Sequence, residues 1–261
     1  MVNKKLRQEI KTYNIVALSF ARGIGSTHKR RCLWNLCGKS ILQWSFEIVR
    51  DSEYIDEIVL GTEDLEIAQF AEKIGMTVIM RPLEDALDFP IDYARGIHKR
   101  IKPRSLTHGE LTSWPRRHHY LLYCLREQKS CIPDLVFGWT PNMPLATTET
   151  VNKVIEAFFR DPEASCSRSA YAVDPKFFTI NPVTQRLFPV FIDLPQSLDR
   201  QLYPPAFRIG PFNLEGLPLK GKGKLTHVII DREEGIRIHS KKDLDYAGYL
   251  MEKRLKGGEK K

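Results

Sequence analysis

An apolar run followed at once by a glycine-containing basic loop constrains the fold of this chain more than any other feature. The run covers 15–19 and passes into Ala21-Arg22-Gly23. A continuous apolar run of this length is typical of a strand buried in a parallel sheet. In α/β proteins ligands bind at the carboxyl ends of such strands, and glycine lets backbone amides approach an anion. The sequence therefore predicts a polyphosphate site directly after the first strand.

The chain as a whole is basic, and this loop carries part of its positive charge. The loop carries five side chains that are cationic or can become so, Arg22, His28, Lys29, Arg30 and Arg31. The net charge of +8 over 261 residues suits an anionic small substrate or nucleic acid. Further basic residues cluster separately at 95–104, 116–119 and 220–224, and no RNA-recognition motif with stacking aromatics is present. We therefore expect a small anionic ligand and no nucleic-acid partner.

Strand-like and helix-like segments alternate along the first half of the chain. The expected strands cover 15–19, 57–61, 76–80 and 133–139, and the expected helices cover 40–49, 63–75 and 148–159. This order of elements is typical of a mostly parallel sheet with helices on both faces. We therefore expect a single α/β domain over residues 1–261, built on a Rossmann-like sheet.

Two ranges depart from this alternation. Residues 95–131 are rich in basic residues and proline, and we interpret them as an insertion whose latter part, 120–125, forms a helix on the sheet. Residues 174–219 are rich in proline and aromatic residues and are expected to form a lid or dimerisation subdomain of short strands and loops. Near the C-terminus, 241–254 has the pattern of an amphipathic helix and 257–261 that of a disordered tail.

The composition favours a cytoplasmic protein without a membrane partner. No apolar stretch is long enough for a membrane span, and the charged first residues are not followed by an apolar signal core. The five cysteines include no Cys-x-x-Cys pair, which argues against a disulfide framework or a zinc site. Cys32 and Cys37 lie near the basic loop. For these two cysteines, a buried packing role and a reactive thiol are both open interpretations.

Several short motifs follow one another along nearly the whole chain. They are Ile15–Arg31, Leu36–Lys39, Ile55–Ala68, Arg81-Pro82, Pro141–Leu145, Asp199–Pro205 and Ile236–Ala247. In order and spacing they resemble the cytidylyltransferases that activate 2-keto-3-deoxy sugar acids, the acylneuraminate and 3-deoxy-octulosonate type. The resemblance implies a fold of the nucleotide-diphospho-sugar transferase type. It also implies transfer of CMP from CTP to a sugar acid, giving CMP-sugar and pyrophosphate.

The same resemblance implies the residues of the site. The nucleotide would be bound by Ala21, Arg22, Gly23, Gly25, Ser26 and Arg31. Arg22 and Arg31 would be the catalytic residues, since such transfers depend on positioning and charge neutralisation. Arg200 and Gln201 would bind the sugar acid, because a guanidinium matches the geometry of a carboxylate.

Magnesium is the cofactor that the resemblance implies, bound in the family through an Asp-Ile-Asp segment. In this chain the corresponding residues are Arg237-Ile238-His239. A guanidinium repels Mg²⁺, and a neutral imidazole is a poor ligand for this hard cation. The metal ligands are therefore unknown, and the carboxylates that remain open are Asp64, Asp231, Glu233, Glu234 and Asp243. The family's loop lysine is also replaced, by Ser26.

Two functions remain open. The first is a cytidylyltransferase that takes CTP or another NTP and an anionic sugar, and that forms a homodimer through 174–219 as family members commonly do. The second is a catalytically degenerate protein that binds a nucleotide or sugar nucleotide on the same fold, which the Arg237-Ile238-His239 segment favours. Two of the predicted binding residues have a structural role as their alternative. Arg22 would then lie in a solvated turn, and Arg200 would form an ion pair with a neighbouring carboxylate.

Overall fold

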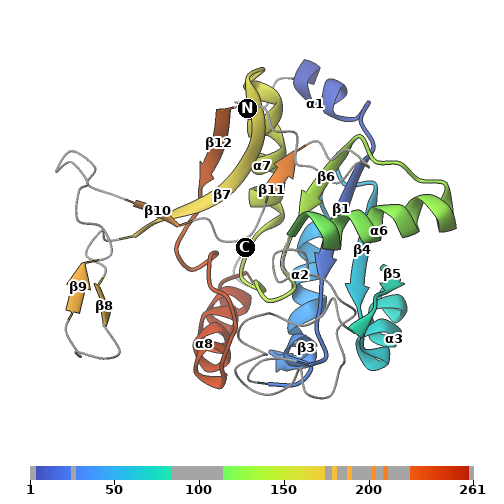
Figure 1. The fold of residues 1–261 in the computed structure, drawn as a ribbon. Coiled ribbons are helices and arrows are strands. Elements are labelled where there is room, and N and C mark those ends of the chain that lie inside the picture. Colours follow the sequence, from blue (N-terminus) through green and yellow to red (C-terminus); the bar gives the residue numbers. More distant parts are fainter. Residues whose placement is uncertain are drawn as a thin grey trace.

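A mixed sheet of eight strands forms the centre of the structure (Figure 1). This computed structural model describes residues 4–24, 28–83, 114–173, 178–180, 187–189, 201–203, 208–210 and 224–258. The strands lie in the order β10-β7-β11-β6-β1-β4-β5, and β12 pairs with β7 beside this path. Their bounds are β1 Ile15–Phe20, β4 Glu57–Thr62, β5 Thr77–Met80, β6 Leu135–Gly138, β7 Ala164–Val173, β10 Gln201–Tyr203, β11 Arg208–Gly210 and β12 Lys224–Ile229.

The four strands β6, β1, β4 and β5 run parallel, as the sequence predicts. Leu18 of β1 lies opposite Val59 of β4 and Gly138 of β6. Val59 in turn lies opposite Thr77 of β5. Because both faces of these strands are covered, the apolar run of β1 is buried almost throughout. The predicted α/β class and parallel sheet are confirmed.

Four of the described helices cover one face of this sheet, the last three of them in the positions that the sequence predicts. They are α1 Lys4–Ile10, α2 Ile41–Arg50, α3 Leu65–Lys73 and α7 Thr148–Arg160. Each of the last three begins at a side chain that accepts a backbone N–H, and these N-caps are Ser40, Asp64 and Thr147. The buried residues of α2 recur at helical spacing, for example Leu42, Phe46 and Val49.

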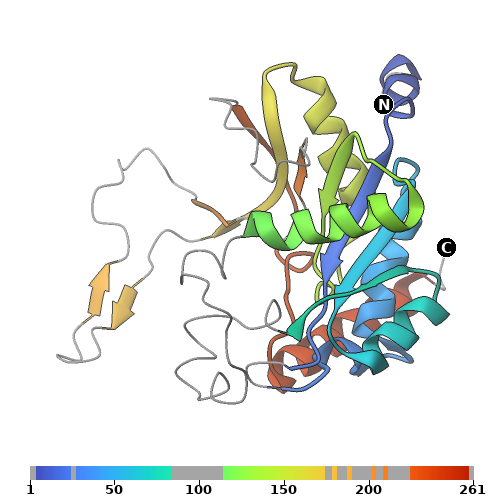
Figure 2. The same ribbon diagram turned by 45° about the vertical axis from the view of Figure 1, so that its right-hand side comes forward.

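A longer helix, α6 Trp114–Lys129, covers the opposite face and crosses in front of the parallel strands (Figure 2). Leu121, Leu122 and Leu125 are buried there against Val16, Leu18, Val59 and Ile79. Burial of each such leucine contributes roughly 1.5–3 kcal/mol. The prediction of a helix packed on the sheet at 120–125 is confirmed and extended on both sides. Residues 95–113 lie outside the described residues, so the insertion stays a prediction there.

The range 174–219 is described at four short strands. β8 Phe178–Ile180 and β9 Leu187–Pro189 pair with each other and lie apart from the main sheet in both views (Figures 1 and 2). β10 pairs with β7, and β11 lies between β6 and β7 in the main sheet. Part of this range is therefore built into the sheet, in addition to any lid or subunit contact.

Three smaller features complete the fold. The hairpin of β2 Asn35–Leu36 and β3 Lys39–Ser40 packs against α8 Lys241–Gly258. The prediction of disorder from residue 257 is wrong for the first two residues, because Gly257 and Gly258 form the end of α8, where glycine is common. Lys224, the last residue of the basic cluster 220–224, begins β12. Among the described residues no helix is both long and apolar enough to cross a membrane.

Candidate nucleotide site

The loops that follow the four parallel strands meet at one edge of the sheet. Backbone hydrogen bonds tie the start of two of these loops to the neighbouring strand: the Ala21 N–H donates to Gly61 O of β4 at 3.1 Å, and the Trp139 N–H donates to Leu18 O of β1 at 3.2 Å. Ala21 is buried, so the chain leaves β1 in a fixed direction. This is the edge at which open α/β sheets bind their ligands, and it carries the predicted nucleotide loop.

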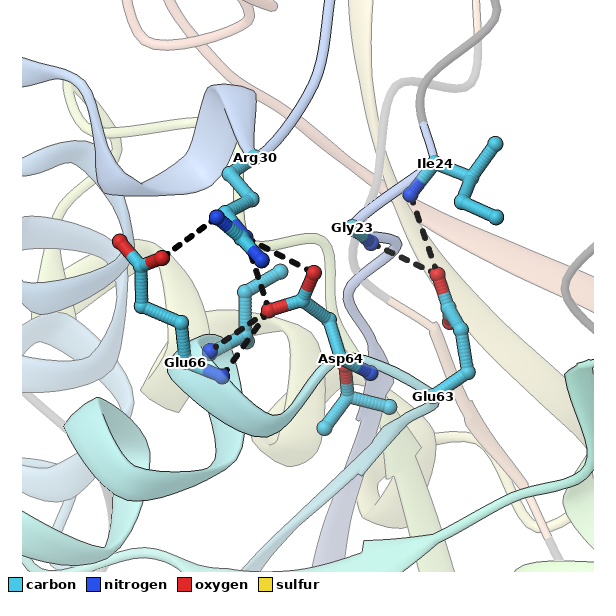
Figure 3. Close-up of polar contacts among 8 residues, drawn as sticks. Gly23, Ile24, Arg30, Glu63, Asp64 and Glu66 are labelled. Carbon is cyan, nitrogen blue, oxygen red and sulfur yellow. Dashed lines mark hydrogen bonds and ion pairs between the residues drawn. The ribbon is translucent and has the colours of Figure 1, made fainter.

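The amides of the glycine loop are engaged by a carboxylate from the next strand (Figure 3). Oε1 of Glu63 accepts the N–H of Gly23 at 2.7 Å and the N–H of Ile24 at 3.2 Å. Oε2 of the same side chain pairs with Nη2 of Arg81 at 3.1 Å. The sequence predicts that the Gly23 amide cradles a phosphate, whereas in this structure it holds the carboxylate of Glu63. Sequence reasoning missed Glu63 because it places this residue at the start of a helix.

Asp64 holds the other side of the loop. Its carboxylate accepts Nε of Arg30 at 2.8 Å and 3.0 Å and also caps α3. A Cβ at Gly23 would lie 2.1 Å from Oδ2 of Asp64, so only glycine fits at this position. Arg30 adopts a left-handed backbone at φ 46° and donates its N–H to Gly23 O at 3.0 Å. Arg30, one of the five basic residues of the loop, thus neutralises the carboxylate of Asp64.

Arg31 turns to the opposite side and meets the C-terminal segment. It lies in the short 3₁₀ helix Arg31–Leu33, and its Nη1 donates to the carbonyl of His239 at 3.2 Å. Burial lowers the pKa of its guanidinium, and the nearby charge of Arg22 lowers it further. Two arginines that repel each other at the end of β1 form a site suited to an anion. The two predicted catalytic residues are thus near enough for the charge of one to act on the other.

The segment that carries Arg237 and His239 is fixed against the loop after β6. The Ile238 N–H donates to Asn142 O at 3.0 Å, and Nδ2 of Asn142 donates to Ile238 O at 3.3 Å. Burial lowers the pKa of His239, as do the charges of Arg31 and Arg237, while Asp243 opposes them. A pocket of about 760 Å³ opens here and is lined by both Arg237 and His239. The same pocket is lined by three carboxylates as well, Asp231, Glu233 and Asp243, so its walls carry both signs of charge.

The described residues at this position do not fit a magnesium site. Oδ2 of Asp243 accepts the N–H of His239 at 2.9 Å, the N–H of Ser240 at 2.7 Å and the hydroxyl of Ser240 at 2.9 Å. Glu234 accepts the hydroxyls of Thr147 and Thr150, and Asp64 is bound to Arg30. Within the described part of the chain no three His, Cys, Asp or Glu residues gather as metal ligands do. No step of the reaction is therefore assigned to a metal.

For most of the remaining predicted site residues, the structure describes only the backbone or nothing. Gly25, Ser26 and Arg200 lie outside the described residues, and Gln201 is described only by its backbone, in β10. Cys32 is buried, and burial raises its thiol pKa to about 12. Because the thiolate is the reactive form, Cys32 is a packing residue and not a reactive thiol.

The lowered pKa of His239 gives a first testable prediction. An imidazole with a pKa below its ordinary value is neutral at pH 7. Replacing Arg237→Gln removes one of the charges that disfavour protonation, so the pKa of His239 should rise. NMR titration of the His239 ring protons measures this pKa, with Lys242→Gln on exposed α8 as the control. An unchanged pKa in Arg237→Gln would show that Arg237 does not act on the site.

Comparisons with known proteins agree with this fold. A profile of the family described as Cytidylyltransferase matches residues 25–88, which include Arg31 and Glu63. A structure of CMP:2-keto-3-deoxy-manno-octonic acid synthetase complexed with CTP matches at a TM-score of 0.63 and 13% identity, covering 92% of this chain and 99% of that one.

Two structures of 4-diphosphocytidyl-2C-methyl-D-erythritol synthase match as well. The one from Anaerococcus prevotii DSM 20548 has a TM-score of 0.55 and 15% identity, and the other has 0.56 and 11%. Both cover 92% of this chain and 99% of their own. No curated protein sequence matches the chain. The chain thus has the fold of these cytidylyltransferases and carries the family's sequence signature over 25–88, so the resemblance predicted from its sequence is confirmed.

Proposed function

We propose that this chain is a nucleotidyltransferase that transfers CMP from CTP to a 2-keto-3-deoxy sugar acid. The observation that carries the proposal is that the charge of Arg22, which follows β1, acts on the half-buried guanidinium of Arg31. The cytidylyltransferase profile matches residues 25–88, which include Arg31 and begin shortly after Arg22. A polyphosphate is the ligand that best offsets two neighbouring guanidinium groups.

In the proposed reaction the anomeric hydroxyl of the sugar acid attacks the α-phosphorus of CTP. The bond from this phosphorus to the bridging oxygen breaks, pyrophosphate leaves, and the hydroxyl proton passes to solvent. The protein contributes position and charge, since such transfers need little covalent participation. Arg22 and Arg31 neutralise the triphosphate, and Arg237 adds positive charge beside them. Arg200 and Gln201 are proposed to bind the sugar carboxylate.

Pyrophosphate release tests the proposal. Purified protein is incubated with each NTP in turn and with a panel of sugar acids, both with magnesium and with EDTA. We expect release with CTP and one class of 2-keto-3-deoxy acid. If no pair of substrates releases pyrophosphate and no nucleotide binds, the proposal is wrong.

A second candidate function follows from the Arg237-Ile238-His239 segment. Since this segment lacks carboxylates, the chain is also suited to hold a nucleotide or sugar nucleotide without turning it over. In that case CTP raises the melting temperature while no substrate pair gives a product. Turnover in the pyrophosphate assay would exclude this function.

We also propose a homodimer that uses the range 174–219. The β8–β9 hairpin supports it, because these strands lie apart from the main sheet in both ribbon views (Figures 1 and 2). Sedimentation equilibrium should give twice the chain mass of 30.2 kDa. A monomer at micromolar concentration would contradict this assignment.

A further inference from the structure

A carboxylate occupies the part of the nucleotide loop where a phosphate is expected. Glu63 follows β4, and its Oε1 lies between two successive backbone amides, 2.7 Å from the N of Gly23 and 3.2 Å from the N of Ile24 (Figure 3). Successive amides that converge on one oxygen form the kind of concave anion site that binds phosphates in other loops. Here the chain supplies its own anion.

This carboxylate is buried and already neutralised. The side chain of Glu63 is 4% exposed and that of Arg81 is 1% exposed, and they pair at 3.1 Å. The backbone N–H of Arg81 donates to Thr62 O at 2.9 Å, so the chain after β5 is fixed where this side chain begins. One carboxylate oxygen thus serves the loop and the other serves Arg81. Because removal of either partner leaves a buried charge unpaired, the pair stays in place.

The consequence concerns the residue next to Gly23. Arg22 lies close enough to Arg31 that the two charges repel. Because Arg22 is bonded directly to Gly23, a movement of the loop at Gly23 would carry Arg22 away from Arg31. The bond from the Gly23 N–H to Glu63 and the close approach of Gly23 to Asp64 oppose such a movement. The loop is therefore held in place by carboxylates before any nucleotide arrives.

We propose that Glu63 is a positioning residue of the nucleotide site: its carboxylate fills the anion position at the amides of Gly23 and Ile24 and so keeps Arg22 beside Arg31. The phosphates of the nucleotide then bind on the arginine side of the loop and not at these amides. This inference rests on the proposed function, since it assigns a role in binding CTP. Preorganisation of this kind lowers the cost of ordering a loop when the ligand binds.

The test compares CTP affinity in Glu63→Ala and in the matched control Glu66→Ala. Glu66 is also at the start of α3 but is 59% exposed and pairs with Arg30. By calorimetry we expect Glu63→Ala to weaken CTP binding about tenfold or more, and Glu66→Ala to change it less than about twofold. Acetate or formate should restore affinity to Glu63→Ala, because a free carboxylate can enter the space beside Arg81. A residue with only a structural role would not give this rescue.

A second readout does not depend on CTP. The amide NMR signals of Gly23 and Ile24 should move in Glu63→Ala and return when acetate is added. If Glu63→Ala does not fold, Glu63→Asp keeps the charge but shortens the side chain, and the same rescue should appear in part. In that variant kcat should change less than the KM for CTP.

Three outcomes would overturn the inference. Unchanged CTP affinity in a folded Glu63→Ala variant would show that Glu63 does not position the loop. Tighter binding in that variant would show that Glu63 competes with the nucleotide for the amides. Wild-type protein that binds no nucleotide would overturn the proposed function itself, and the inference with it.

Discussion

Arg31→Ala is expected to lower the affinity for CTP about 10- to 100-fold, the effect of losing a charged hydrogen-bond donor to phosphate. Arg31 is half-buried, and burial together with the charge of Arg22 lowers its pKa. An anion bound between the two guanidinium groups removes their repulsion, so both contribute more to binding than exposed charges do. Isothermal titration calorimetry with CTP measures the change.

Two control variants separate the loss of the Arg31 hydrogen-bond donors from the loss of one positive charge. Arg31→Lys keeps the charge but loses the planar donor pair, so it should recover only part of the affinity. Arg50→Gln removes one positive charge from α2, where Arg50 pairs with the neighbouring Asp51, and should leave affinity within about twofold. If Arg50→Gln weakens CTP binding as much as Arg31→Ala does, the site assignment is wrong.

The parallel core of this fold could be predicted because its signals are local. The run at 15–19 is apolar on both faces, and α2 shows helical spacing directly after the capping residue Ser40. The strand β11 gave no such signal, because three residues, Arg-Ile-Gly, are too few to show a period. Its place between β6 and β7 depends on long-range pairing. Pairing of this kind cannot be read from one segment.

For the candidate site, the sequence predicts where the nucleotide loop lies, and the binding roles of its residues stay predictions. Arg22 and Arg31 follow a buried strand, and the sequence places them at the ligand-binding edge of the sheet. The role of Glu63 could not be predicted, because it depends on the register between β1 and β4 and on Arg81 after β5. A glutamate before an expected helix is usually an exposed charge near the helix N-terminus. Only the fold reveals that its side chain turns inward to the loop.

Magnesium dependence distinguishes this site from one built on carboxylates. Arg237 and His239 stand where the resemblance places aspartates, and the charges of Arg31 and Arg237 both act on His239. We expect wild-type protein to bind CTP in EDTA, because arginines supply the neutralising charge. Magnesium complexes free CTP and reduces its negative charge, so its addition should leave the affinity unchanged or lower it. Calorimetry at matched ionic strength measures both conditions.

In the double variant Arg237→Asp/His239→Asp, magnesium should instead raise the affinity for CTP. Two carboxylates in place of the cations would repel free CTP and offer oxygen ligands to the metal. In EDTA its CTP affinity should fall about 100-fold, and magnesium should restore about tenfold or more of this loss. The single variant Arg237→Ala, which removes a cation without adding a ligand, should lose affinity in EDTA and gain nothing from magnesium. Wild-type protein that binds CTP only with magnesium would show that another carboxylate holds the metal and that the arginines alone do not neutralise the triphosphate.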